Sequence, residues 1–221
     1  EDFLRWIKEK RNNSPSTCNQ RLGALKSFFL YLQFALPDRS LQCQEVLNIR
    51  QMKQQTPELK YLTIEGIKFL LNQPDISTKY GRRDLALLSL MYDTGARVQE
   101  VAEIRISYIR FSAPATIRLT GKGNKTRVVP ILSRTEQILK QYIEEFKLVN
   151  RGNETYLFLN RDGQQLSRFG ISYILTKYAD MARKERPDLI PEKLSPHCLR
   201  HSKAMHLLQA NVNLVYIRDL L

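Results

Sequence analysis

The sequence predicts a mainly α-helical protein with a small antiparallel β-sheet, in which an all-helical domain precedes an α+β domain. Three observations support this. Apolar residues recur at helical spacing through most of the 221 residues. Strand-like alternation is concentrated around residues 117–131. A polar stretch with Pro57 lies at 53–60, so we expect domains at 1–52 and 61–221 joined by this linker.

The first domain is expected to hold three helices. Phe3, Leu4 and Ile7 share one face of a helix over residues 2–11, which the break at 12–15 ends. A second helix runs from Ser16 to Pro37, and a third, shorter one lies within 40–50. The apolar stripe of the second helix comprises Leu22, Leu25, Phe28, Phe29 and Leu32.

The second domain begins with helices that carry clear end signals. Thr63 caps a helix that runs to about Asn72. Residues 85–91, after Asp84, are apolar on nearly every face, which indicates a central buried helix that stops at Gly95. A further helix follows over 98–104. Residues 117–120 and 127–131 then alternate as two strands around a basic, glycine-rich turn.

The remainder returns to helices. Ser133 and Glu136 form a capping box for a helix through about Val149, and residues 156–159 are expected to form a short strand. Another helix spans roughly 167–185. A helix begins at Ser195, and the last one begins near Val212. The inward residues of the 167–185 helix are Ile171, Ile174, Leu175, Tyr178 and Ala182.

Charge is the strongest property of the whole chain. Its 35 lysines and arginines exceed its 22 acidic residues and give a net charge of +13, which favours an anionic partner such as nucleic acid. Three cysteines without C-x-x-C spacing are typical of reduced cytoplasmic thiols, and no apolar run is long enough to span a membrane. We therefore expect a cytoplasmic protein with no membrane partner. The cysteines are Cys18, Cys43 and Cys198.

All three histidines fall within residues 195–206. Pro196 suits the first position of a helix whose first turn carries His197 and, three residues later, Arg200 on the same side. An arginine and an imidazole at a helix N-terminus make an anion site that can move a proton. A zinc site is the less favoured interpretation, because the sequence offers no second cluster of ligands to join His197 and His201. We therefore expect no metal. His201 and His206 are better explained by packing.

Two other stretches are chemically distinctive. Residues 94–100, TGARVQE, place Arg97 just after a glycine break at the start of a helix, where it can clamp an oxyanion; alternatively it forms a surface pair with Glu100. Residues 121–127, GKGNKTR, form a basic turn that can approach a DNA groove, or else a merely solvated hairpin. The spacing differs from that of a P-loop.

Together these stretches resemble the tyrosine recombinase, or phage integrase, family. The matching motifs are T-G-A-R-x-x-E at 94–100, G-K-G-N-K-x-R-x-V-P at 121–130 and S-P-H-x-L-R-H at 195–201. Residues 1–52, notably 19–29, are similar to the family's helical core-binding (SAM-like) DNA-binding domain, and 61–221 to its catalytic domain. The resemblance implies DNA integration, recombination or transposition by an enzyme of a phage, transposon or other mobile genetic element, or of a chromosome-resolution system.

The resemblance also implies roles for individual residues. Arg97 and Arg200 would bind the scissile DNA phosphate, Lys122 would be the general acid, and His197 would hydrogen-bond the phosphate. Glu100 and His201 would orient these groups. The product would be a 3′-phosphotyrosyl intermediate, formed without cofactor, metal or ATP. Expected DNA contacts are Arg21, Lys26, Lys125, Arg127 and Arg168.

The sequence departs from the family pattern after Leu221, where the family continues to its nucleophilic tyrosine. Tyr216 lies before that point and is interpreted as a packing residue. We therefore expect a fragment, cut at both ends, that binds duplex DNA but does not cleave it. The complete protein would act on inverted-repeat core sites as a dimer to tetramer. A type IB topoisomerase-like enzyme and a non-catalytic DNA-binding module remain as alternatives.

Overall fold

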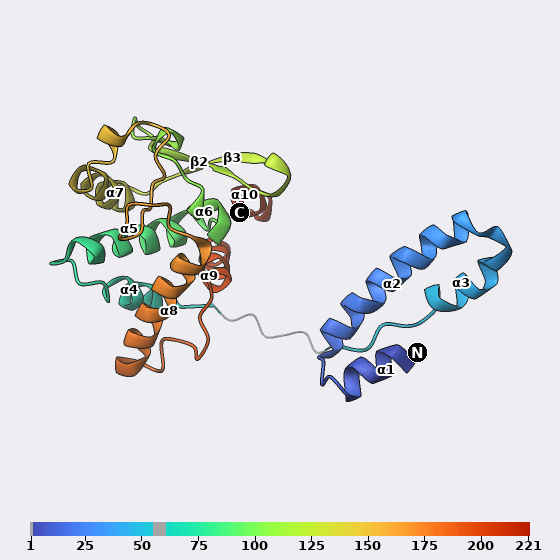
Figure 1. The fold of residues 1–221 in the computed structure, drawn as a ribbon. Coiled ribbons are helices and arrows are strands. Elements are labelled where there is room, and N and C mark those ends of the chain that lie inside the picture. The colour runs from blue at the N-terminus through green and yellow to red at the C-terminus, as the bar shows by residue number, and fades with distance from the viewer. Residues whose placement is uncertain (1, 55–60) are drawn as a thin grey trace. The chain divides into compact units, whose positions relative to one another are not determined.

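The computed structural model describes residues 2–54 and 61–221, apart from the side chain of Lys122. The chain divides into two compact units, residues 1–58 and 59–221 (Figure 1). Most of the expected linker, 53–60, lies outside the described residues. Each unit is described by itself below.

Unit 1 is a small helical unit with α1 (Asp2–Glu9), α2 (Pro15–Ala35) and α3 (Ser40–Leu47). The hydroxyl of Ser14 accepts a hydrogen bond from the Thr17 N–H, which starts α2 one residue before the expected position. The Asn19 side chain exchanges two hydrogen bonds with the Met52 main chain, at 2.9 and 2.8 Å, and so ties the segment after α3 to α2. The core of the unit is Leu4, Ile7, Cys18 and Leu22.

The apolar stripe expected on α2 is only partly buried. Leu22 is in the core, but Phe28 is 56% exposed. The reason is size: the core of unit 1 takes Cys18 and Leu22 from the start of α2, and the elements that pack on α2 are all short, namely α1, α3 and the 3₁₀ turn Pro37–Arg39. Periodicity located the helix but overestimated the length of its buried face.

Unit 2 is organised around α5 (Lys79–Thr94), which packs against α4 (Ile64–Leu71), α7 (Ser133–Glu145) and α9 (Pro196–Gln209). The remaining helices are α6 (Val98–Ala102), α8 (Arg168–Glu185) and α10 (Leu214–Leu220). The predicted caps Thr63 and Gly95 are confirmed, the latter with φ +58°. However, α5 begins at Lys79 rather than after Asp84, because the Thr78 hydroxyl accepts a hydrogen bond from the Gly81 N–H.

The sheet has three antiparallel strands in the order β1 (Ile109–Arg110), β2 (Thr116–Thr120) and β3 (Thr126–Pro130). The hairpin of β2 and β3 was predicted; the two-residue β1 was not. The turn is closed by a 2.8 Å hydrogen bond from Gly121 N to Lys125 O, and Gly123 sits at φ +76°, a conformation that favours glycine. Figure 1 shows this hairpin beside α10.

Three predictions for this part of the chain were wrong. Ser133 does not cap α7, because the helix starts one residue earlier than expected: the Glu136 N–H donates to the main-chain oxygen of Leu132 at 2.9 Å, which makes Leu132 the N-cap, and the Leu132 N–H itself donates to Asp93 at 2.7 Å. This helix also ends at Glu145, not near Val149. Residues 156–159 form no strand, because they make isolated bridges, Arg105 to Tyr156 and Leu159 to Gln165, in place of a ladder.

Candidate active site

Arg97 is held at the start of α6 by a reversal of the chain at Gly95. The left-handed conformation of Gly95 ends α5, and Arg97 is the N-cap of the next helix, with its N–H donating to Glu100 Oε2 at 2.8 Å. Its guanidinium reaches the same carboxylate, with Nη1 3.0 Å from Oε1, and the side chain remains 50% exposed. The alternative Arg97–Glu100 pair therefore exists, but it leaves half of the arginine facing solvent.

Glu100 is the buried centre of this region. Its side chain is 2% exposed, and Arg127 on β3 donates to both of its oxygens at 2.8 Å. Burial alone would raise the pKa of Glu100, but the hydrogen bonds from Arg127 and Arg97 outweigh it and hold the pKa below its ordinary value. Glu100 is thus an anion that fixes two arginines from two different elements.

Arg200 enters from the first turns of α9, as the sequence predicted. Its Nη1 donates to the main-chain oxygen of Gly95 at 2.8 Å, and Nη2 donates to the oxygen of Leu221. Burial, followed by the positive charges of Arg97 and Arg127, lowers the pKa of Arg200 to about 10, while Glu100 acts in the opposite direction. The guanidinium groups of Arg97 and Arg127 therefore share one carboxylate, Arg200 adds a third positive charge close by, and this surplus of positive charge favours an anion.

The β2–β3 hairpin lies against this cluster. A Cβ added at Gly121 would stand 2.8 Å from Glu100 Oε1 and 3.8 Å from Arg97 Nη1, so the hairpin can approach only because this residue is glycine. Lys122 follows immediately, in a short 3₁₀ turn over residues 122–124. Its main chain is therefore next to the arginines, but its side chain lies outside the described residues.

The histidines occupy three different environments on α9. His197 is exposed in the first turn, one helical turn before Arg200, and His201 is half-buried. His206 is buried, with Nδ1 2.9 Å from the Tyr92 hydroxyl and its ring edge-on to Tyr61 and Tyr92. The packing interpretation therefore fits His206, while His197 is accessible to a ligand.

The expected DNA contacts separate into two groups. Arg21, Lys125 and Arg168 are exposed and Lys26 is half-buried, so their side chains are accessible. Arg127 differs because its side chain is only 17% exposed. It makes a bidentate pair with Glu100 and donates through Nε to Leu220 O at 2.9 Å. The structure therefore gives Arg127 a role inside the site, where it joins β3 to α6 and α10. Its position opposite Leu119 in the sheet explains this burial, because cross-strand partners share one face.

Tyr216 does not have the packing role expected from the sequence. It lies on α10 but is 71% exposed, because the inward residue of that helix is Ile217. The three cysteines carry no disulfide in the part of the chain that the structure describes. Within that same part, no group of three histidine, cysteine or acidic side chains is arranged to hold a metal ion.

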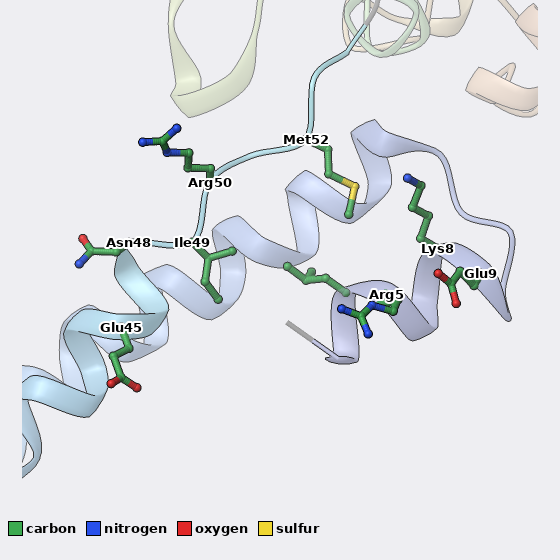
Figure 2. A pocket seen from close by; sticks show the side chains of 9 residues that line it. Arg5, Lys8, Glu9, Glu45, Asn48, Ile49, Arg50 and Met52 are labelled. Carbon is green, nitrogen blue, oxygen red and sulfur yellow. The ribbon is translucent and has the colours of Figure 1, made fainter.

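Unit 1 carries a separate hollow of about 650 Å³ (Figure 2). Figure 2 shows it between α1, which supplies Arg5, Lys8 and Glu9, and the segment after α3, which supplies Arg50. Glu45 also lines it, so the lining contains both basic and acidic side chains. Neither Arg21 nor Lys26 contributes to this hollow.

The fold is that of a mainly helical protein in which an arginine cluster lies beside a β-hairpin, and comparison with known proteins identifies its family. The sequence model of the phage integrase family matches residues 60–221, and the chain belongs to this family of tyrosine recombinases. The resemblance inferred from the three motifs is thereby confirmed, as is the mainly helical fold with a small antiparallel sheet.

Individual relatives agree with this assignment. Tyrosine recombinase XerD of Listeria innocua is 33% identical over 96% of this chain and 69% of its own length. The integrase/recombinase y4rC of Sinorhizobium fredii is 35% identical over 96% of this chain but 63% of its own length, so the chain spans less than two thirds of that relative. Among solved structures, the Tn1549 transposon integrase in complex with circular intermediate DNA matches with a TM-score of 0.75 and 17% identity, over 99% of this chain and 74% of that one.

The helices were also compared with the requirements of a membrane span. Among residues 2–54 and 61–221, none of the helices combines the length and the apolar character needed to cross a bilayer.

Proposed function

We propose that this chain provides the phosphate-binding part of a site-specific DNA recombinase. The observation that carries the proposal is the charge imbalance at the site: Arg97, Arg127 and Arg200 converge around a single carboxylate, Glu100. Such a cluster can stabilise the transition state of phosphodiester cleavage, because negative charge develops on the non-bridging oxygens of the phosphate. Duplex DNA is the natural source of that group for a chain with a net charge of +13.

The proposed reaction assigns one task to each group. Arg97 and Arg200 hold the non-bridging oxygens, and His197 hydrogen-bonds the phosphate from the first turn of α9. A tyrosine hydroxyl attacks phosphorus and passes its proton to His197, the bond to the 5′ oxygen breaks, and Lys122 gives that oxygen its proton. The products are a 3′-phosphotyrosine and a free 5′ hydroxyl. Glu100 orients the arginines, and His201 supports the helix that carries Arg200.

The second half of the reaction reverses the first on another strand. A 5′ hydroxyl of the partner duplex attacks the phosphotyrosine, releases the tyrosine and restores a phosphodiester, so no ATP and no metal ion is needed. Exchange between two duplexes requires cleavage on both, and we therefore propose inverted-repeat core sites occupied by a dimer that pairs into a tetramer. Arg21, Lys26, Lys125 and Arg168 are proposed to contact the DNA backbone.

We propose further that the nucleophile is not among residues 1–221. Tyr216 is the tyrosine nearest in sequence to the contacts that Leu220 and Leu221 make with Arg127 and Arg200, but it precedes them by a helical turn and points to solvent. The chain also spans only 63% of the length of one relative. A longer protein that carries this chain would therefore supply the tyrosine, and residues 1–221 alone would bind DNA without cleaving it.

The test is a nicked suicide duplex, which traps the covalent intermediate. The longer protein should form an adduct that denaturing gels resolve, whereas residues 1–221 should bind the duplex with no adduct. Arg200→Ala should reduce adduct formation by about 10²–10³-fold, since one oxyanion contact is worth about 3 kcal/mol, with duplex binding kept within about tenfold. Binding should weaken steeply between about 50 and 200 mM salt.

The outcomes separate the alternatives. An absent adduct with intact duplex binding would point to a non-catalytic DNA-binding module. Relaxation of supercoiled DNA of any sequence, without recombinant product, would point to a type IB topoisomerase-like enzyme. Unchanged adduct formation in Arg200→Ala would remove Arg200 from the site.

A further inference from the structure

The interface between the end of α5 and α9 contains three successive polar contacts. Arg200 Nη1 meets the Gly95 oxygen at 2.8 Å, Lys203 Nζ meets Asp93 Oδ1 at 3.4 Å, and His206 Nδ1 meets the Tyr92 hydroxyl at 2.9 Å. Residues 200, 203 and 206 are spaced by three and so lie along one side of α9. The catalytic candidate Arg200 is thus the first member of a regular series.

The middle contact is a buried ion pair to which the proposed reaction assigns no task. The side chain of Lys203 is 12% exposed and that of Asp93 is 3% exposed. Asp93 also accepts the Leu132 N–H at 2.7 Å, so one carboxylate joins α5, α9 and the start of α7. The main chain at Gly95 packs close to Lys203 as well, since a Cβ added there would stand 3.8 Å from the Lys203 Cβ.

Arg200 depends on the placement of its helix because no acidic side chain holds it. In the described part of the chain its hydrogen-bond partners are main-chain oxygens, those of Gly95 and Leu221. A guanidinium held in this way moves with α9, whereas Arg97 is fixed by its own bond to Glu100. The distance and orientation of Arg200 relative to Arg97 therefore depend on how α9 is aligned against the end of α5.

We propose that Asp93 and Lys203 are positioning residues that set α9 on α5 and thereby place Arg200 opposite Arg97. The proposal rests on the proposed function only for its readout in cleavage. A buried pair has one favourable alignment, set by two charges and the Leu132 N–H, whereas apolar side chains of similar size allow sliding and rotation. The pair thus fixes alignment rather than simply adding stability.

The test separates alignment from stability by replacing the pair in two ways. Lys203→Met leaves the Asp93 carboxylate buried and unpaired, and should lower both the melting temperature and the cleavage rate. The double variant Asp93→Leu with Lys203→Met removes both charges, and should restore the melting temperature, because apolar pairs replace buried ion pairs without loss. The double variant also removes the acceptor of the Leu132 N–H; because Leu132 as a residue is 60% exposed, we expect water to replace that bond.

Cleavage by the longer protein is measured on the suicide duplex at saturating DNA, with duplex affinity measured separately. The double variant should cleave at least about 30-fold more slowly than the wild type, with its affinity changed less than about threefold, because a misplaced arginine affects the transition state. Lys203→Arg, which keeps the charge, should cleave faster than Lys203→Met. The matched control is Arg82→Gln with Glu145→Gln, a pair at the opposite end of α5, which should leave the cleavage rate unchanged.

Recovery of cleavage together with the melting temperature in the double variant would overturn the proposal, because the pair would then be merely structural. A crystal structure of the double variant of residues 1–221 gives a readout that does not depend on activity. We expect the hydrogen bond from Arg200 Nη1 to the Gly95 oxygen to be lost. A guanidinium in the same position as in the wild type would also overturn the proposal. A wild-type protein that forms no adduct would instead contradict the proposed function, and the crystal structure would still decide the role of the pair.

Discussion

Replacing Glu100 with glutamine should destabilise unit 2 more than any change of a surface charge. The carboxylate accepts four hydrogen bonds: from Arg97 N–H, Arg97 Nη1, Arg127 Nη1 and Arg127 Nη2. Glutamine keeps the shape but loses the charge, and it turns an amide N–H₂ toward one of the guanidinium groups. Three arginines then lie close together without a counter-charge.

The magnitude follows from burial. Loss of one partner of a buried ion pair costs about 3–5 kcal/mol, but Arg97 is half exposed and its share is screened by water. We therefore expect about 3 kcal/mol at neutral pH. For a unit of this size, where about 1 kcal/mol shifts the melting temperature by 2–4 °C, this corresponds to a decrease of about 6–12 °C.

The measurement is thermal unfolding of residues 1–221 as a function of pH. The pKa of Glu100 is below its ordinary value, so its contribution is complete above the pKa of an unfolded glutamate, about 4.3, and is lost as the pH falls through the folded pKa. The gap between the wild type and Glu100→Gln should therefore be constant above about pH 5 and narrow in more acidic solution. Glu103→Gln, which removes an exposed charge next to the same helix, is the control and should change the melting temperature little. A gap below about 1 kcal/mol, or one that persists unchanged in acid, would refute the role given to Glu100.

Two further changes test other parts of unit 2. Burial lowers the pKa of His206; the main-chain oxygen of Leu62 acts in the opposite direction, and the charge of Lys203 adds a smaller lowering effect. The unfolded chain therefore takes up a proton before the folded one, and stability should fall as the pH drops below about 6.5. Melting curves of the wild type and His206→Phe between about pH 5 and 8 check this, and an equal pH slope in both would contradict it. Gly121→Ala should lower the free energy of unfolding by about 1–3 kcal/mol, because the new Cβ would stand 2.8 Å from Glu100 Oε1. The control is Gly23→Ala in α2, where the new Cβ meets nothing within 4 Å, so this change should be neutral or stabilising. Equal melting temperatures for the two variants would show that Gly121 is not a contact residue.

The elements that the sequence predicted well have their signals within a few residues. Thr63 and Ser167 cap α4 and α8 through bonds to the N–H three residues later, and Gly95 ends α5 by its own left-handed conformation. Such contacts can be inferred from spacing alone. The fold class and the inward face of α8, with Ile171 and Tyr178, followed in the same way.

The features that the sequence did not reveal depend on distant partners. The start of α7 is tied to Asp93, which accepts the Leu132 N–H from 39 residues earlier in the chain. The outward position of Phe28 depends on which face of α2 the short helices α1 and α3 cover. Spacing within a single stretch carries no information about either.

Arg127 is a different case, because a local signal was present. It precedes the buried Val129 by two residues on β3, and residues two apart on a strand share a face. Strand alternation alone would therefore have placed Arg127 toward the interior, where an arginine requires a carboxylate. Its charge and its place in a basic motif suggested DNA instead. For a charged residue in a strand, the face it occupies is more informative than the charge of its neighbours.

The arginines of unit 2 differ in the groups that hold them. Arg83 is buried and forked onto Asp84, and Arg82 is bidentate to Glu145, so each charge is neutralised where it stands. Arg200 is held by main-chain oxygens, which fix its position but leave its formal charge uncompensated. A site that must bind an anion needs this second arrangement, because a carboxylate on every arginine would compete with the phosphate. Glu100 is shared by Arg97 and Arg127, and under the proposed function its burial would keep it away from the anion that Arg97 and Arg200 are proposed to hold.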